Sequence, residues 1–162
     1  MKHIIPYVAL ILSWLCLPLI AADKKPKIVP NGPKAKEAIE KEIRFRLGKP
    51  PGMLTEPDLM KVKTLDLNQK KISDVGALKR LRQVKWLWLN SNKICDVSAL
   101  RELRQLRYLD LGFNQVTDLS ALKNLKLLTH LDLRNNPNLS NSQVAEIRAA
   151  LPKCRIYSNP SK

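Results

Sequence analysis

The sequence has few of the residues on which catalytic and cofactor sites are usually built. It contains five glycines and two histidines among 162 residues, and it lacks a glycine-rich phosphate loop, an H-E-x-x-H pair and a C-x-x-C pair. After residue 22 the only histidine is His130, and no serine or cysteine shares the columns of side chains described below. We therefore expect a protein that is not an enzyme and that needs no metal or cofactor.

Acidic residues are scarce relative to basic ones. The chain has 14 Asp and Glu against 29 Lys and Arg, which gives a formal net charge of +15 at pH 7. A charge of this sign attracts anionic lipid, acidic polysaccharide, acidic protein or nucleic acid, and it does not choose among them. The alternative is that the basic residues only keep the protein well solvated and that it has no polyanionic partner.

The first 22 residues have the pattern of a secretory signal peptide. A short basic start at residues 2–3 precedes an apolar stretch over residues 4–20 and two small residues. The apolar stretch is short for a membrane helix, and a retained anchor is the alternative. A lipoprotein anchor at Cys16 is disfavoured, because Trp14 and Leu15 stand where small residues are needed. We expect export to the periplasm, the cell surface or the medium.

A 22-residue repeat accounts for most of the remaining chain. Pairs of leucines recur at this spacing, as Leu65/Leu67, Leu87/Leu89, Leu109/Leu111 and Leu131/Leu133. The fifth position after the first leucine of each pair is Lys70, Asn92, Asn114 or Asn136. With an apolar residue three positions before each pair, the pattern is L-x-x-L-x-L-x-x-N. After a one-residue insertion, Leu151, Cys154, Ile156 and Asn159 fit the same frame as a degenerate fifth unit.

This pattern resembles the leucine-rich-repeat family, in the 22-residue form of bacterial internalin-like proteins, over about residues 62–159. The resemblance implies an α/β fold, a right-handed solenoid of β strands and 3₁₀ or short helical turns. Its short curved parallel sheet would have about five coils and a helical N-terminal cap. It also implies a concave face that is presented to a protein partner.

The repeated positions have physical tasks in such a stack. Alternating leucines face a shared core, because one coil cannot bury its leucines alone. Buried asparagines need a ladder of hydrogen bonds to backbone groups. Asp74, Asp96 and Asp118 precede short turns and are suited to cap them. Lys70 interrupts the ladder, so we expect the first coil to be imperfect.

The segments outside the repeats are predicted to cover the ends of the stack. We divide the chain into a signal peptide (1–22), a flexible basic linker (23–33), a helical N-terminal cap (34–61) and the repeats (62–159). The cap has a helix over 34–47 that stops at Gly48, and a second helix that opens with a Thr55–Asp58 capping box. The other end is closed by a helix over 142–151 and a strand over 154–157.

The two cysteines after residue 22 are predicted to be free thiols. Cys154 falls on a buried leucine position of the fifth unit. Cys95 lies about three coils away, roughly 14 Å at ~4.8 Å per coil, which exceeds the Cα separation of about 7 Å that a disulfide allows.

The outward strand positions form three columns on the expected concave face. The first column is Thr64, Trp86, Tyr108, His130, Lys153; the second is Asp66, Trp88, Asp110, Asp132, Arg155; the third is Asn68, Asn90, Gly112, Arg134, Tyr157, with Phe113 at its rim. Clustered aromatic side chains beside polar ones are typical of interaction hot spots. The ligand-binding residues that we predict are Trp86, Trp88, Tyr108, Asp110, His130, Asp132 and Arg134. The alternative is that the cap or linker folds over the tryptophans.

Two other uses of the surface remain open. Asp110 and Asp132 are expected about 5 Å apart on neighbouring strands, which is compatible with sugar hydrolysis or a cation site, but the open surface and the adjacent Arg134 favour charge pairing. Basic residues recur on the outer loops in two rows, Lys79/Arg101/Lys123 and Arg82/Arg104/Lys126, which suits a polyanion or serves solubility.

The leading hypothesis is an exported interaction module, a monomer, that binds a protein or glycan on its concave face. The alternative is an electrostatic binder of anionic envelope polymer or lipid through the two rows. We do not expect nucleic acid to be the partner.

Overall fold

Five parallel strands form one sheet, in the order in which they occur along the chain. The structure, a computed structural model, describes residues 33–159. Each strand contributes three residues, and their bounds are β1 (Thr64–Asp66), β2 (Trp86–Trp88), β3 (Tyr108–Asp110), β4 (His130–Asp132) and β5 (Arg155–Tyr157). Between the first four strands the register is 22 residues, so that Leu65 pairs with Leu87 and Leu87 with Leu109.

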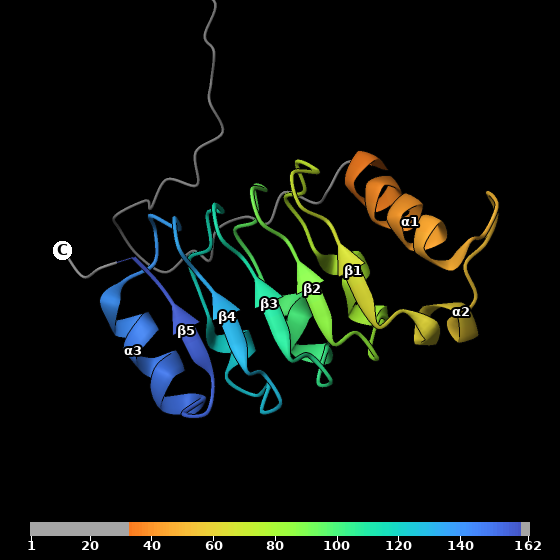
Figure 1. Ribbon diagram of the computed structural model, residues 1–162. Helices are drawn as coiled ribbons and strands as arrows, with labels where there is room; N and C mark the ends of the chain where they lie inside the picture. The colour runs from red at the N-terminus through yellow and green to blue at the C-terminus, as the bar shows by residue number, and fades with distance from the viewer. Residues whose placement is uncertain (1–32, 160–162) are drawn as a thin grey trace, which may run out of the picture.

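The core lies on one side of this sheet and is closed by short helical turns. Figure 1 shows the strands side by side with these turns behind them. They are the 3₁₀ helices η1 (Gly76–Arg80), η2 (Ser98–Glu102) and η3 (Ser120–Leu122), and the α helix α3 (Asn141–Ala150). The central leucine of each of the first four strands is fully buried. The predicted leucine-rich-repeat solenoid is confirmed.

A ladder of buried amides joins the coils. It consists of Asn92, Asn114 and Asn136. The Nδ2 of Asn114 donates to the carbonyl of Leu111 in its own coil (3.0 Å) and to that of Leu89 in the preceding coil (2.9 Å). Its Oδ1 accepts from the backbone N–H of Ile94 (3.0 Å). Asn92 and Asn136 repeat this arrangement, as the sequence predicted.

The aspartates before the 3₁₀ turns are structural. Asp74, Asp96 and Asp118 each accept a hydrogen bond from the backbone N–H two residues later, which belongs to the first residue of η1, η2 or η3. These short side chains therefore satisfy a backbone donor where each turn begins, in agreement with the predicted capping role.

The N-terminal end of the sheet is covered by two helices, α1 (Pro33–Leu47) and α2 (Glu56–Lys61). Gly48 adopts φ +62° directly after α1, a left-handed conformation that glycine tolerates at a helix end. Thr55 and Asp58 form a complete capping box at the start of α2. The buried Asp58 also pairs with Lys49 at 2.7 Å, and the hydrogen bonds from Lys49 and Thr55 hold the pKa of Asp58 well below its usual range.

Lys70 replaces an asparagine of the ladder in the first coil, and it is exposed. Its Nζ lies 3.6 Å from a carboxylate oxygen of Glu42 on α1. The first coil therefore exchanges one step of the ladder for an ion pair with the cap, which agrees with the expected imperfection.

The predicted register of the fifth coil is wrong by two residues. Ile156, rather than Cys154, pairs with Leu131, a separation of 25 residues. The reason is that α3 has ten residues whereas the 3₁₀ helices have three to five, so this coil uses more chain before the next strand. Consequently Lys153 is not a column residue, and Arg155 and Tyr157 follow His130 and Asp132. Asn159 is exposed, and its Oδ1 accepts from the N–H of Asn135 (3.0 Å).

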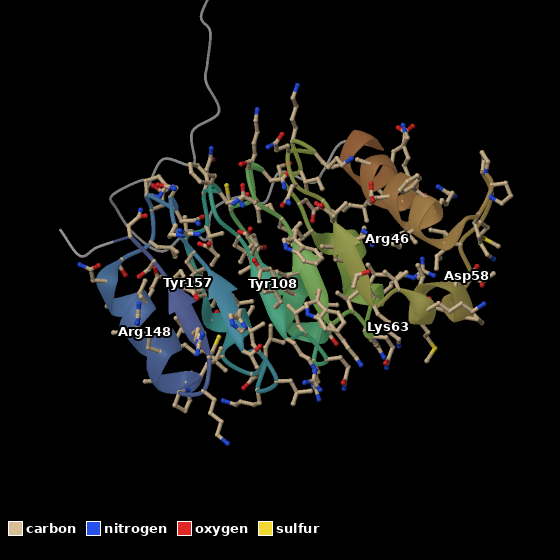
Figure 2. All side chains as sticks on the ribbon, in the orientation of Figure 1. Arg46, Asp58, Lys63, Tyr108, Arg148 and Tyr157 are labelled. Atoms are coloured by element: carbon tan, nitrogen blue, oxygen red, sulfur yellow. The ribbon has the colours of Figure 1, made fainter. Side chains whose placement is uncertain are left out.

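The outer edge of β5 is engaged by a side chain of α3. Arg155 donates its backbone N–H to Thr129 (2.8 Å) and Tyr157 accepts from the N–H of Leu133 (2.8 Å), the two residues that flank β4. Ile156 between them therefore directs its peptide groups away from β4. The guanidinium of Arg148 donates to the carbonyl of Ile156 (3.2 Å) and to Oγ of Ser158 (3.2 Å). Arg148 and Tyr157 are labelled in Figure 2.

The cysteines differ from the prediction. Cys154 carries a free thiol, but it is only half-buried beside the core because of the changed register. Cys95 is disulfide-bonded, so the predicted free thiol there is wrong. The predicted distance excluded only a disulfide between Cys95 and Cys154, and the free thiol of Cys154 agrees with it.

The predicted signal peptide (1–22), and the linker (23–33) except for Pro33, lie outside the described residues. Within residues 33–159, no helix has the length and apolar character needed to cross a membrane. The division of the chain into domains stays a prediction.

Candidate interaction surface

The side of the sheet that faces away from the core, which we call the open face, carries the predicted binding residues. The register stacks Trp86 beside Tyr108 and Tyr108 beside His130 in the first column, and Trp88 beside Asp110 and Asp110 beside Asp132 in the second. The predicted neighbours are therefore brought together on β2, β3 and β4, and Figure 2 labels Tyr108 near the middle of the sheet.

Four ring-bearing side chains form a group on the open face, which we call the aromatic stripe: Trp86, Trp88, Tyr108 and His130. The rings of Trp88 and Tyr108 are 5.4 Å apart between centroids and tilted by 42°. The rings of Tyr108 and His130 are 6.1 Å apart and tilted by 31°. Trp86 is 39% exposed, so the described part of the cap does not fold over it. Burial raises the pKa of the Tyr108 hydroxyl, with a contribution from the nearby Asp110 carboxylate.

The aspartates of the second column bind backbone. Each accepts a hydrogen bond from the N–H two residues later: Asp66 from Asn68, Asp110 from Gly112 and Asp132 from Arg134, all at 2.9 Å. The Arg134 guanidinium also donates to both carboxylate oxygens of Asp132. Burial would raise the pKa of Asp132, but the hydrogen bonds and charge of Arg134 outweigh it and lower the pKa. An ion-paired carboxylate of this kind is poorly suited to proton transfer.

Arg134 connects this column to the end of the sheet. Its guanidinium lies 5.7 Å from the ring centroid of Tyr157 on β5, a cation–π geometry. Asp110 of the same column also has a side-chain partner, because Nδ2 of Asn90 donates to its carboxylate (3.3 Å). A Cβ at Gly112 would stand 2.7 Å from that Nδ2, so glycine leaves the space that the Asn90 amide occupies.

Phe113 lies in an unfavourable backbone conformation. It has φ +53°, and the equivalent positions of the other coils, Gln69, Ser91 and Asn135, are also left-handed. Asparagine tolerates this conformation, whereas a bulky side chain resists it. The Phe113 side chain is 58% exposed, so it gains little from burial. The fold does not require phenylalanine at this position.

The two predicted basic rows are only partly available. Lys79 and Arg101 are exposed, and the Arg101 side chain donates to the carbonyl of Ser98 (3.0 Å). At the C-terminal end of the rows, Lys123 pairs with Glu146 of α3 at 2.7 Å, and Lys126 donates to the carbonyl of Ala150 (3.1 Å). The last member of each row is therefore bound to the closing helix α3, Lys123 to a side chain and Lys126 to a backbone carbonyl.

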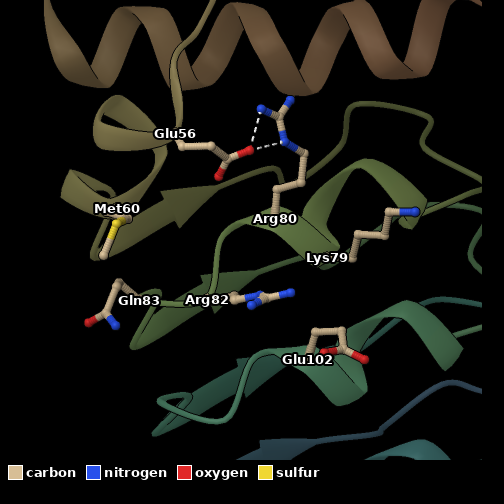
Figure 3. Close-up of a pocket in the computed structure, with 7 residues that line it drawn as sticks. All are labelled: Glu56, Met60, Lys79, Arg80, Arg82, Gln83 and Glu102. Carbon is tan, nitrogen blue, oxygen red and sulfur yellow. Dashed lines mark hydrogen bonds and ion pairs between the residues drawn. The ribbon is translucent and has the colours of Figure 1, made fainter.

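A surface hollow of about 670 Å³ lies between α2 and the first loops (Figure 3). Its lining combines basic, acidic and apolar side chains: Glu56, Met60, Lys79, Arg80, Arg82, Gln83 and Glu102. Arg80 is already bound to Glu56 at 2.6 Å. This mixture of charges does not single out one kind of ligand.

A third row of basic side chains was missed at the sequence level. Lys63, Lys85 and Arg107 immediately precede the first-column residues and recur every 22 residues. That recurrence was the signal that could have revealed them. We call this row the basic border.

No group of three or more histidine, cysteine, aspartate or glutamate side chains within residues 33–159 could hold a metal ion. Cys154 carries a free thiol, and burial raises its pKa to about 11, which makes it a poor nucleophile near neutral pH.

Comparison with known proteins supports the repeat. The family model for leucine-rich repeats (2 copies) matches residues 104–150. The structure is similar to internalin C2 from Listeria monocytogenes, with 22% identity, a TM-score of 0.68, and 74% of this chain and 52% of that one covered. A second Listeria internalin, InlF, has 25% identity and a TM-score of 0.59, with 80% and 44% covered.

A leucine-rich-repeat protein from Leptospira interrogans is also similar, with 32% identity, a TM-score of 0.57, and 64% of this chain and 28% of that one covered. The chain thus spans about half or less of the length of these three proteins. A search of the curated proteins finds no match.

Proposed function

Since this chain is a leucine-rich-repeat protein of the bacterial internalin-like type, we propose that it is an exported interaction module that binds a protein or glycan partner on its open face. The repeats and the internalin-like neighbours suggest a protein-interaction module in general. The open face as the site, a glycan as a possible partner, and export through residues 1–22 are our proposals.

The aromatic stripe carries this proposal. Trp86 occupies a column position that holds Thr64 in the first coil and Arg155 in the fifth, so the sheet itself does not demand an aromatic residue there. Trp and Tyr are enriched in binding hot spots because they offer a large contact area with few rotatable bonds. The polar rim around the stripe, with Asp110, Asp132 and Arg134, supplies directional contacts.

A non-catalytic role is consistent with the geometry. Leucine-rich-repeat folds of this kind are typically interaction scaffolds rather than enzymes. Asp110 and Asp132 bind backbone amides, and Asp132 is also paired with Arg134. We therefore favour binding over the hydrolysis that two neighbouring carboxylates could suggest.

The second candidate function is electrostatic binding of anionic envelope polymer or lipid through the outer rows. It is supported by the exposure of Lys79, Arg82, Arg101 and Arg104. It is weakened by the ion pair of Lys123 with Glu146 at the end of one row.

The experiment compares capture of envelope or host components by the immobilised full chain, a Trp86→Ala/Trp88→Ala variant and a Phe45→Ala control. Phe45 is 81% exposed on α1, so the control removes an exposed aromatic ring that does not belong to the sheet. We expect a component that the wild type and the control capture at low and at high salt and that the double variant loses, with unchanged circular dichroism. Equal capture by all three would contradict the proposal. Capture that moderate salt or Lys79→Glu/Arg101→Glu abolishes would favour the second candidate.

A further inference from the structure

We infer that the partner of the open face is an acidic protein, and that its carboxylates bind the basic border formed by Lys63, Lys85 and Arg107. This inference rests on the proposed function, because it concerns the same face. It adds the basic border to the proposed site and states that the partner carries negative charge.

The basic border is fixed to the aromatic stripe by the backbone. The N–H of Lys85 donates to the carbonyl of Lys63, and the N–H of Arg107 donates to that of Lys85, both at 2.8 Å. The N–H groups of Trp86 and Tyr108 donate to the same two carbonyls, at 3.2 and 3.0 Å. One cation therefore stands next to the stripe in each of three consecutive coils, at intervals of about 4.8 Å.

Of the border residues, Lys63 and Arg107 are exposed and Lys85 is half-buried. Within the described part of the chain, none of these three side chains forms an ion pair, and Lys63 donates only to the neutral amide of Gln83 (3.2 Å). Lysines elsewhere are neutralised, as in Lys49–Asp58, Lys70–Glu42 and Lys123–Glu146. Lys63 is labelled in Figure 2, at the start of β1.

The border continues outward along the loops. Arg82 and Arg104 lie three residues before Lys85 and Arg107, and they line a hollow of about 400 Å³ with Gln83, Gln105 and Glu102. Two guanidinium groups and two amides in this hollow can donate several hydrogen bonds to carboxylates. Glu102 supplies one opposing charge.

On the other side of the first column, the sign of charge changes. The second column contains the carboxylates of Asp66 and Asp110, and that of Asp132, which is paired with Arg134, so a partner meets cations at the border, then rings, then carboxylates. A uniform polyanion that covered the whole face would be repelled by Asp66 and Asp110. A protein can place carboxylates over the border and neutral or basic groups over the aspartates, which is the complementarity that fixes register in protein interfaces.

The test uses a random copolymer of glutamate and tyrosine as the probe, with heparin and phosphatidylglycerol vesicles as the other arms. The full chain is compared with Lys85→Glu/Arg107→Glu and with the control Lys71→Glu/Lys93→Glu. The control changes the net charge equally at two exposed lysines of adjacent coils, outside the border and the stripe. We expect the copolymer to bind the wild type and the control alike and to bind the border variant at least about tenfold more weakly, with a reduced association rate.

Four results would overturn the inference, the last of them together with the proposed function. Equal losses in the border variant and the control would mean that only net charge matters. Binding of heparin or of the vesicles, but not of the copolymer, through the border would identify a glycan or a lipid partner instead. If Trp86→Ala/Trp88→Ala reduces capture of envelope or host components but Lys85→Glu/Arg107→Glu does not, the proposed function stands and this inference fails. If neither variant changes capture, both fail.

Discussion

Replacing Asn114 by alanine tests whether the amide ladder stabilises the stack. The Asn114 side chain is 3% exposed and bonds to backbone groups of three different segments. An alanine leaves the neighbouring coils in place but removes the only side chain that accepts the N–H of Ile94.

The magnitude follows from what the removed amide leaves behind. The carbonyls of Leu89 and Leu111 keep a second donor, because Nδ2 of Asn92 also reaches Leu89 and Nδ2 of Asn136 also reaches Leu111. The N–H of Ile94 is left without a partner, at a cost of about 1–3 kcal/mol. The two N–H groups of the amide, which reach the carbonyls of Leu89, Leu111 and Gly112, are also lost, at about 0.5–1.5 kcal/mol each. We expect the free energy of unfolding to fall by about 3 kcal/mol.

The assay is urea unfolding followed by far-ultraviolet circular dichroism. The matched control is Asn124→Ala, which changes an exposed asparagine and should shift the free energy of unfolding by less than about 0.5 kcal/mol. A loss below about 1 kcal/mol for Asn114→Ala would refute the reasoning, because it would mean that the ladder adds little to the burial of leucines.

Three further predictions concern single residues. Phe113→Asn should raise the free energy of unfolding by about 1 kcal/mol, because asparagine accepts the left-handed conformation that Asn135 has in the next coil; an unchanged urea midpoint would count against backbone strain at Phe113. Because folding lowers the pKa of Asp58, its ionised carboxylate stabilises the fold at pH values above the usual carboxyl pKa, and this contribution is lost as pH falls. Between about pH 5 and pH 3 the free energy of unfolding of the wild type should therefore fall more than that of Asp58→Asn. Parallel pH profiles of the two proteins would contradict this. Cys154, with its pKa raised to about 11, should react with iodoacetamide at pH 8 much more slowly than a free cysteine, as peptide mass mapping would show; equal rates would mean that burial does not suppress the thiolate.

Most of the fold is predictable from the sequence because each 22-residue unit places the same types of residue in the same surroundings. Each leucine that fits the 22-residue frame is buried by the next coil, so the register of β1 to β4 follows from counting residues. The roles of Asn92 and Asp96 follow in the same way, since a buried amide and a turn each need a definite hydrogen bond.

The fifth coil could not be placed by counting. Cys154 and Ile156 are two residues apart and point to the same side of a strand, so either could take the position opposite Leu131. The choice depends on how many residues α3 uses, and a helix boundary is the least certain feature of a sequence pattern.

The candidate site was predictable as a set of columns, but its interactions were not. The ring contact of Trp88 with Tyr108 and the pairing of Asp132 with Arg134 depend on side-chain rotamers. The ion pair of Lys123 with Glu146 joins residues 23 positions apart and depends on where α3 begins and ends. The 22-residue recurrence of Lys63, Lys85 and Arg107 is visible in the sequence, but their lack of ion pairs in the described part of the chain depends on where acidic side chains of other elements lie.

The contact of Arg148 with the carbonyl of Ile156 has a consequence for how the protein meets other sheets. An incoming strand could extend the sheet beyond β5 only by hydrogen bonding to the outer edge of that strand, and it would first have to displace this guanidinium from the acceptor it needs. A basic side chain at the edge also repels a second copy of the same edge. The contact of Arg148 with β5 therefore disfavours end-to-end addition of a strand at this edge.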